Sequence, residues 1–504
     1  MESRVTATAT LTAFVLLCAL LIPTYAHAQE IESAEGRLFE GRDAEIPEVQ
    51  DLLGLWDTPE DFMEMTYKRP TDASTLTRRT DETGQMAEYR EFYYSEDPLL
   101  SQYIDAAIYA NPAIWESEHR WRATMQRIPQ ASALPDPMFT ITQWIHKPET
   151  RVGPQETILS LSERFPWFGK LDAKGEMALR DALSAAEEYQ SRIREVVLAV
   201  KHSYYDLAFL DTAIQITQHD RELLSHFEEI AQTRYATGRG IQQAVIKIQA
   251  EISKDDDRLL LLRQQRQSVA ANLNTLMDRP AHEPLPALAR PKVPKVESNL
   301  QELYATGRRN RHELKAARYQ IEKSAQAIRL AKKEYFPDLT VGFNYIFVDD
   351  RKDFAGKTSP VEDNGRDAYG IMLGVNLPIW EGKLMSGVRE AREMKRASER
   401  RYGSVENAME FSIRDAVLRA QTSYEQLALY ERVLIPQAEQ ALNSTESAYA
   451  TGQLNALDLI DSQRFLLSVK LSHARLASDY LQALADIERA IGTAYPTEEA
   501  LTEQ

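Results

Sequence analysis

Residues 339–348 read LTVGFNYIFV, a run in which large apolar side chains alternate with small or polar ones. The large side chains are Leu339, Val341, Phe343, Tyr345 and Phe347. Alternation with a period of two is typical of a β-strand whose two faces meet different surroundings. A tilted strand of about 9–11 residues can cross a bilayer. The run therefore predicts either a lipid-facing strand or a half-buried strand of a soluble sheet.

Three more runs of this kind follow from the sequence. The clearest has a large apolar face that contains Ile371, Leu373 and Val375, whereas the two runs nearer the N-terminus alternate less regularly. Four strands cannot close a barrel, and lipid does not tolerate open sheet edges, so identical subunits would have to complete a membrane sheet. Aromatic residues near the strand ends favour the lipid-facing interpretation. They are Trp144, Trp167, Tyr369 and Trp380. The expected strands lie at about 138–146, 155–164, 339–348 and 368–379.

The chain passes twice through one order of elements: helix, strand, strand, long helix, turn and helix. Each copy opens with a helical stretch, at 98–130 and at 298–335. Such internal similarity predicts two structural repeats with one architecture. The expected boundaries are 97–278 for the first repeat, 279–297 for a proline-rich linker, 298–492 for the second repeat and 493–504 for a C-terminal tail.

Three short motifs recur in both copies at corresponding places. A Pro-Asp pair precedes the first strand, as Pro135-Asp136 and Pro337-Asp338. A proline–aromatic corner follows the second strand. The corners read FPWFGK at 165–170 and LPIWEGK at 377–383, and the long helices both end in YATG, at 235–238 and 449–452. These motifs place the strand–helix corners at one end of the long helices and the turns at the other.

The long helices are unusual in length. Residues 168–235 would form a helix about 100 Å long, and residues 384–449 one of similar length with a kink at Pro436. Globular helices average about 11 residues, so these are coiled-coil-like rods. A seam of packed side chains is expected along Ile193, Val197, Val200, Tyr204 and Leu207. Rods of this kind suit a wall that crosses the periplasm, a filament or a scaffold.

The N-terminus predicts export. Residues 13–22 are apolar and are followed by Ala26-His27-Ala28, which is typical of a signal peptide over residues 1–28; an uncleaved anchor is the alternative. The only cysteine, Cys18, lies in this segment. Residues 29–96 are expected to form an acidic extension that wraps or tethers, or a simple spacer. The net charge of −17 argues against a nucleic-acid binder.

With these motifs in this order, residues of about 97–492 resemble the TolC family of outer-membrane efflux proteins. The corner at 165–170 is most similar to the branch that exports heavy-metal cations. The resemblance implies an α+β membrane protein that forms a homotrimer, with a 12-stranded β-barrel continued by a helical tunnel in the periplasm. It also implies a passive exit duct for an inner-membrane pump, often of the resistance-nodulation-division type, joined through a periplasmic adaptor protein.

The resemblance also implies roles for particular residues. The turns with Tyr235, Gly238, Tyr449 and Gly452 would dock the adaptor. Tyr449 matches a position at the periplasmic gate, and two aspartates after the second turn, Asp458 and Asp461, match the family's acidic entrance pair. Three residues apart, these aspartates lie on one helix face, and threefold symmetry would stack them into cation-selective rings. Solvated surface acids are the alternative. The family's locking arginine corresponds to Leu454, so this entrance is expected to be locked differently.

Other chemistry is not indicated by the sequence. The nine histidines form no spacing typical of a metal site, and we expect no cofactor. No G-x-S-x-G motif occurs, and no cysteine nucleophile remains after the signal peptide, so we expect no enzyme. The alternative function is a periplasmic coiled-coil scaffold or adaptor with a soluble β-domain. The substrate and the identity of the partners do not follow from the sequence.

Overall fold

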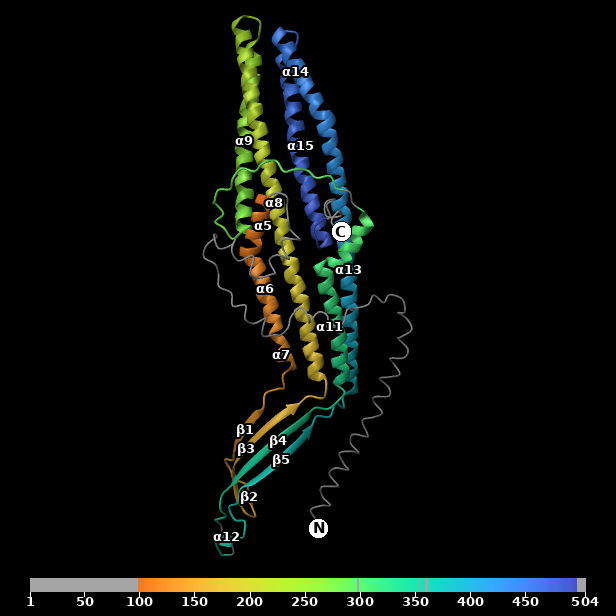
Figure 1. The fold of residues 1–504 in the computed structure, drawn as a ribbon. Coiled ribbons are helices and arrows are strands. Elements are labelled where there is room, and N and C mark those ends of the chain that lie inside the picture. The colour runs from red at the N-terminus through yellow and green to blue at the C-terminus, as the bar shows by residue number, and fades with distance from the viewer. Residues whose placement is uncertain (1–97, 297–298, 353, 359–360, 496–504) are drawn as a thin grey trace. The chain divides into compact units, whose positions relative to one another are not determined.

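The computed structural model describes residues 98–296, 299–352, 354–358 and 361–495. The expected signal peptide and acidic extension, and residues 496–504 of the expected tail, lie outside the described residues. The first half of the described chain contains three short helices, three strands and two long helices (Figure 1). They are α5 (Pro98–Ala110), α6 (Pro112–Met125), α7 (Arg127–Ser132), β1 (Met138–Gln143), β2 (Glu149–Thr150), β3 (Gly153–Phe165), α8 (Lys170–Ala236) and α9 (Gln242–Leu276).

The second half runs through a similar order. Its elements are α10 (Leu300–Asn310), α11 (His312–Lys333), β4 (Leu339–Val348), α12 (Phe354–Thr358), β5 (Ala368–Val375), α13 (Glu381–Leu429), the π-helical turn η2 (Tyr430–Leu434), α14 (Ile435–Thr451) and α15 (Ala456–Ile491). The π-helical turn ends at Leu434, two residues before Pro436, which has no N–H with which to continue the α-helical ladder. Helix α13 is therefore followed by α14 without a loop.

The helical stretches before the strands are broken, although each was expected as one segment. Residues 98–132 form three helices because Asn111 caps a new helix, accepting a hydrogen bond from the Ala113 N–H at 2.9 Å, with Pro112 in its first turn. The second stretch breaks at Arg311, whose backbone is extended. These breaks separate α5 from α6 and α10 from α11.

The strands form an antiparallel sheet in the order β1-β3-β4-β5, with the two-residue β2 paired to β3. Strand β3 is longer than expected, whereas β1 and β5 are shorter. Strand β5 ends at Val375 and not at residue 379. The Asn376 backbone N–H still donates to the Asp338 carbonyl oxygen at 3.3 Å in the same register, but Pro378 has no N–H with which to continue the pairing. β1 and β5 are the outer strands of this sheet.

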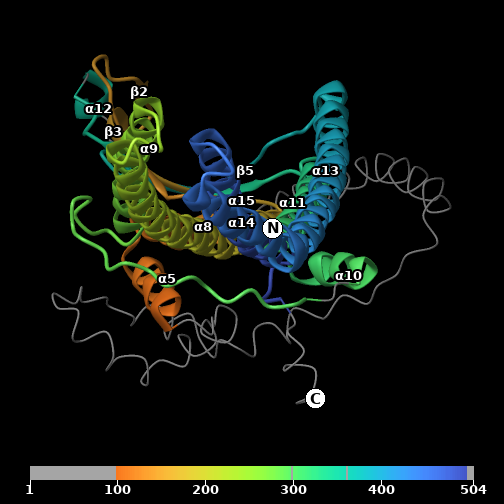
Figure 2. The ribbon, with the colours of Figure 1, turned by 90° about the horizontal axis from the view of Figure 1, so that it is seen from above.

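The long helices pack side by side. Helix α8 contacts α9, α11 and α15, and α13 contacts α11 and α15 (Figure 2). The seam expected along α8 lies in the core between α5, α8 and α9, where all five of its side chains are at most 4% exposed; they are Ile193, Val197, Val200, Tyr204 and Leu207. None of the described helices combines the length and the apolar character that crossing a membrane requires.

Candidate functional site: the helical turns and the exposed sheet

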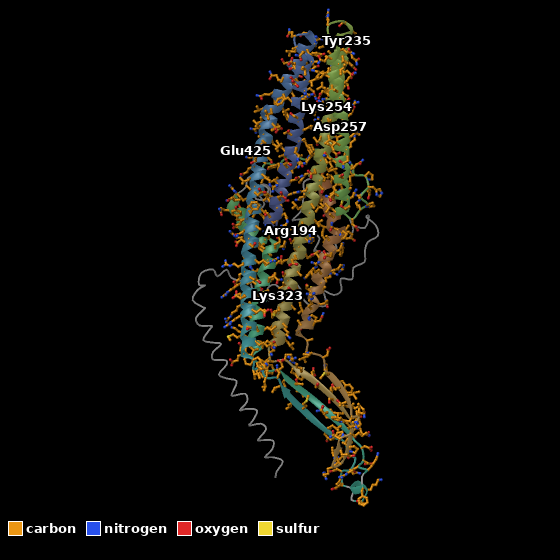
Figure 3. All side chains as sticks on the ribbon, turned by 180° about the vertical axis from the view of Figure 1, so that it is seen from behind. Arg194, Tyr235, Lys254, Asp257, Lys323 and Glu425 are labelled. Atoms are coloured by element: carbon orange, nitrogen blue, oxygen red, sulfur yellow. The ribbon has the colours of Figure 1, made fainter. Side chains whose placement is uncertain are left out.

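The two helical turns lie at the same end of the long helices, opposite the sheet (Figure 1). In each turn a glycine has a left-handed backbone, with φ of 71° at Gly238 and 86° at Gly452. Only glycine adopts this conformation without steric cost, which explains why both YATG motifs end in it. The two tyrosines differ: Tyr235 is 50% exposed at the end of α8 (Figure 3), whereas Tyr449 is 4% exposed.

Arg234 joins the two turns. Its guanidinium donates a hydrogen bond to the Tyr449 carbonyl oxygen and lies over the Tyr449 ring, 4.7 Å from the ring centre. It also donates to the Arg239 carbonyl oxygen at 3.4 Å. Burial raises the pKa of the Tyr449 hydroxyl, and the nearby arginine partly opposes that shift. The sequence analysis missed Arg234, although it directly precedes the YATG motif of the first copy.

The two aspartates expected at the entrance have different surroundings. Asp458 belongs to a capping box at the start of α15, in which the Asn455 side chain accepts the Asp458 N–H at 3.2 Å. Asp461 has a side chain that is 67% exposed, 3.5 Å from the Arg464 guanidinium. Arg464 in turn pairs with Glu251 on α9. The carboxylate that faces this region from the first copy is therefore Glu251, one that the sequence analysis did not consider.

Two buried carboxyl groups lie farther along the same helices. Asp220 on α8 is 6% exposed and Asp255 on α9 is 3% exposed, and the two carboxyl groups influence each other's pKa. Gln463 of α15 also donates to Asp220. Burial first, and the neighbouring Asp255 second, raise the pKa of Asp220 to about 8. Burial also raises the pKa of Asp255. The surroundings of Asp220 therefore favour its protonated form.

The sheet presents a broad apolar face to the outside of the chain. On β4, Phe343 is 46% exposed, and on β5, Ile371 and Leu373 are 78% and 72% exposed. Leu339, Phe347 and Val375 on the same face are also exposed, whereas Val341 and Tyr345 are partly covered. Cross-strand pairing continues this face over the neighbouring strands, since Phe139 lies opposite Leu161, Leu161 opposite Phe343, and Phe343 opposite Ile371. The other face carries small or polar side chains such as Ser160, Ser162 and Asn344.

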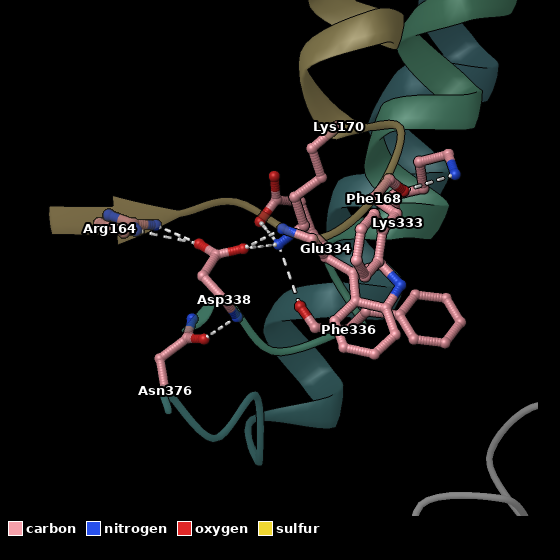
Figure 4. A network of polar contacts seen from close by, with 9 residues as sticks. Arg164, Phe168, Lys170, Lys333, Glu334, Phe336, Asp338 and Asn376 are labelled. Carbon is pink, nitrogen blue, oxygen red and sulfur yellow. Dashed lines mark hydrogen bonds and ion pairs between the residues drawn. The ribbon is translucent and has the colours of Figure 1, made fainter. Parts of the chain in front are cut away.

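A buried ion pair fixes the corner where β3 and β4 meet the helices (Figure 4). Lys170, at the start of α8, donates to Asp338 Oδ1 at 2.8 Å and to the Phe336 carbonyl oxygen at 3.0 Å. Arg164 and the backbone N–H of Trp167 also donate to Asp338, the latter at 3.0 Å. Burial works to raise the pKa of Asp338, but the hydrogen bonds from Lys170 and Arg164 outweigh it and lower the pKa to about 2.

Both partners of this pair lie in motifs that the sequence shows, Asp338 after Pro337 and Lys170 at the end of FPWFGK. Their separation of 168 residues hides their contact from any local pattern. Within the described part of the chain, no group of three or more His, Cys, Asp or Glu side chains could hold a metal ion.

The chain is similar to known outer-membrane proteins over most of its length. A family described as "Outer membrane efflux protein" matches residues 103–278 and 303–493. Nodulation protein T of Rhizobium leguminosarum bv. trifolii is 22% identical over 79% of this chain and 86% of that protein. The cobalt-zinc-cadmium resistance protein CzcC of Cupriavidus metallidurans is 21% identical over 72% of this chain and 83% of that protein.

The fold is also found in solved structures. The outer membrane protein VceC from Vibrio cholerae has a TM-score of 0.65 at 19% identity, covering 80% of this chain and 98% of that one. At this identity the likeness establishes the fold alone, a long-helix and sheet architecture shared with known channels. The family match covers far more than half of the chain and includes both expected copies. The chain therefore belongs to the outer membrane efflux protein family, the TolC family of outer-membrane channels whose helical part lies in the periplasm.

Proposed function

We propose that this protein is a passive exit duct of a tripartite efflux system. Three copies would close their four-stranded sheets into one 12-stranded barrel in the outer membrane, and their long helices would form a tunnel in the periplasm. The duct would receive substrates from a periplasmic adaptor and an inner-membrane pump and release them outside. It would need no cofactor and carry out no catalysis, since energy would come from the pump.

The observation that carries this proposal is the apolar face of the sheet. In one chain Phe343 is 46% exposed, and Ile371 and Leu373 are more than 70% exposed, although each side chain is large and apolar. A soluble protein would bury such a face against a core, but no described element covers it. Lipid is the surrounding that suits it, and the small polar side chains opposite suit a water-filled interior.

The helical turns support the proposed adaptor contact. Both turns lie at the end of the helices farthest from the sheet, and Tyr235 there is half exposed. Together with Gly238, Tyr449 and Gly452, it would form the docking surface for the adaptor. Tyr449 itself is buried, so it would shape the turn and leave direct contact to Tyr235.

The entrance would select cations. In a trimer, Asp461 would form an exposed acidic ring and Asp458 a second ring one helical turn above it.

The closed entrance would be held by a residue other than the one at position 454, because Leu454 cannot form the polar contacts of an arginine. Arg234 at the turns is the candidate, since it joins the two helical hairpins. The likeness to CzcC, a cobalt-zinc-cadmium resistance protein, favours metal cations as cargo, and a pump of the resistance-nodulation-division type would then be the partner.

Single-channel recording of the purified mature protein in planar lipid bilayers tests the duct. Discrete conductance steps are expected, with cations favoured over anions. A matched control is Phe343→Arg, which should fail to insert and give no steps because it puts a charge on the lipid face. A periplasmic scaffold with a soluble β-domain would give no steps in either protein. Absence of steps from correctly inserted wild-type protein, and also from an Arg234→Ala variant with loosened turns, would overturn the duct.

A further inference from the structure

The contact between β3 and β4 joins the two copies of the repeat within one chain. Strand β3 closes the strand pair of the first copy and β4 opens that of the second. Phe165 lies opposite Leu339 in this pairing, and Leu161 lies opposite Phe343. At the helical end of the pairing, Lys170 and Asp338 form the ion pair of Figure 4, with both residues at most 3% exposed. This internal seam therefore shows both the strand register and the ion pair with which the two repeats of one chain meet.

The outer strands correspond to the two sides of this seam, but within the described residues the outer edge of each has no partner strand. Strand β5 corresponds to β3, because each leads into a proline corner, and β1 corresponds to β4, because each follows a Pro-Asp pair. The residues that correspond to Asp338 and Lys170 are Asp136 and Lys383. Both are exposed, and neither side chain has an ion-pair partner within the described residues.

We propose that, where β5 of one copy meets β1 of the next in the proposed barrel, the strands keep the register of the internal seam and Lys383 forms an ion pair across it with the second copy's Asp136. The proposal rests on the proposed function, since it names the partner surface through which the barrel closes. Both outer edges offer unpaired backbone donors and acceptors, which must be satisfied before the sheet can enter lipid.

The register follows from the motifs. Aligning Pro378 with Pro166 and Asp136 with Asp338 puts Val375 opposite Phe139 and Leu373 opposite Ile141. This alignment uses only the prolines and acidic residues. All four of these apolar residues lie on the lipid-facing side of the sheet, as the pairings within the chain show. A slip of one residue would turn one strand's apolar side chains to the other face, so the agreement is an independent check on the register.

Exposed apolar side chains at the proline corners also support a contact between β5 of one chain and β1 of another. In the internal seam, Trp167 stacks on Phe336 with ring centres 5.4 Å apart. The corresponding positions are Ile379 and Leu134, which are 67% and 46% exposed in the single chain, and the adjacent Trp380 is 72% exposed. A second copy would cover these side chains as Phe336 covers Trp167.

The second corner is one residue longer, so Lys383 is the third residue of α13 whereas Lys170 is the first residue of α8. The flexible four-carbon stem of lysine has to span this difference. The register of the strands and the ion pair are therefore tested separately.

Cysteine pairs test the register, since Cys18 is the only cysteine and lies in the expected signal peptide. In-register pairs are Val375→Cys with Phe139→Cys, and Leu373→Cys with Ile141→Cys. The same four positions recombined give controls that are two residues out of register. Facing residues are about 4.5–5.5 Å apart and diagonal ones about 7–8 Å, beyond the usual disulfide span.

After oxidation in membranes, the in-register pairs should give at least about tenfold more covalent dimer and trimer on non-reducing gels than the recombined pairs. Single-cysteine variants should give none. Equal or stronger cross-linking of the recombined pairs would overturn the register. In that case conducting oligomers would still support the duct, whereas absence of any oligomer and of conductance would overturn both proposals.

A charge exchange tests the ion pair. Lys383→Glu should lower the temperature at which the oligomer dissociates, because it puts two carboxylates at the seam. Adding Asp136→Lys should reverse most of the decrease in dissociation temperature, because it restores opposite charges at the seam. If the oligomer of the double variant dissociates at a temperature no higher than that of either single variant, the proposed ion pair is wrong. Lys395→Glu is the control, since it makes the same charge change on α13 away from the corner and should be insensitive to Asp136→Lys.

Discussion

Asp220 and Asp255 are buried carboxyl groups whose surroundings raise their pKa values. Asp220 and Asp255 lie where α8, α9 and α15 meet, and the charged groups nearest to them are Arg258, Glu251 and Asp256 on α9. Arg258 contacts Asp255 at 3.2 Å, so it neutralises one carboxylate but not two. A second ionisation would leave an uncompensated charge among the packed helices.

We predict that the free energy of unfolding falls as pH rises from about 4 to about 8 because of Asp220. Its pKa in the folded chain, about 8, exceeds the ordinary 3.8, so the folded state binds the proton more tightly and loses this advantage as pH increases. Asp220→Asn should flatten the dependence in this range, measured by thermal unfolding in detergent at about pH 5, 7 and 9. Asp257→Asn, on an exposed position of α9, is the control. Identical pH slopes for Asp220→Asn and wild type would contradict the prediction.

At the scale of elements, the two helical hairpins are held together at their tips by a shared core and by Arg234. The core at this end joins α8, α9, α14 and α15, and includes Phe227, Ile248, Tyr449 and Leu459. Between this core and the turns, Arg234 of α8 donates a charged hydrogen bond to the Tyr449 carbonyl oxygen and makes a cation–π contact with the Tyr449 ring. Arg234 is the polar link between the two hairpins at the turns, and Arg464–Glu251 and Gln463–Asp220 link the same hairpins farther along the helices.

Removing that link should loosen the tips. Arg234→Ala loses a hydrogen bond from a charged group, worth about 1.5–3 kcal/mol, and the ring contact. Amides of residues 448–453 should exchange with deuterium about tenfold faster or more, measured by mass spectrometry, and the open fraction of channels should rise. The control is Arg239→Ala, because Arg239 contributes only its backbone carbonyl to this contact. Unchanged exchange in Arg234→Ala would show that the core and the other polar contacts hold the hairpins without Arg234.

The sheet gives a second prediction at this scale. Phe343→Arg puts a charge on the apolar face near the middle of β4 and should destabilise insertion by about 2–4 kcal/mol. Asn344→Arg, the next residue on the opposite face, is the matched control and should insert normally because it faces the proposed interior. Heat-resistant oligomer in the outer-membrane fraction is the readout. Equal amounts of oligomer for the two variants would count against a lipid-facing surface at Phe343.

For the whole molecule, the protein is an outer-membrane efflux family channel with its helices in the periplasm. Properties of the entrance belong to the assembled trimer of the proposal, since a ring of carboxylates exists only when chains are repeated by symmetry. Asp461 is exposed in one chain, and its ion-pair partner among the described residues is Arg464, which also pairs with Glu251. Its charge is therefore largely available to the entrance.

Neutralising the proposed rings should reduce cation preference. Asp461→Asn should lower the ratio of potassium to chloride permeability, and adding Asp458→Asn should lower it further, because each change removes three charges from one level of the tunnel. Reversal potentials in a salt gradient give the ratio. Asp257→Asn serves again as the control that removes the same charge from α9. A ratio that stays constant through the double variant would exclude these aspartates as the selectivity rings.

The sequence by itself was enough to identify the family and the main elements. Strand alternation, helix length and the YATG and proline-corner motifs are local patterns, because they reflect the period of a strand or helix and the backbone angles of a turn. The seam from Ile193 to Leu207 was predicted for the same reason, and the structure confirms that it is buried. The breaks at Asn111 and Arg311 were missed because capping competes with an otherwise helical pattern.

Only the tertiary structure decided which distant side chains meet. Lys170 reaches Asp338, Arg234 reaches Tyr449, and Gln463 reaches Asp220 over separations of 168, 215 and 243 residues. No periodicity records such contacts, because they depend on how whole helices and strands pack against one another. The same packing decides that Tyr449 is buried while Tyr235 is exposed, although both stand in the same four-residue motif. A repeated sequence thus specifies the same local turn twice, and the different neighbours of each copy give the two tyrosines different surroundings.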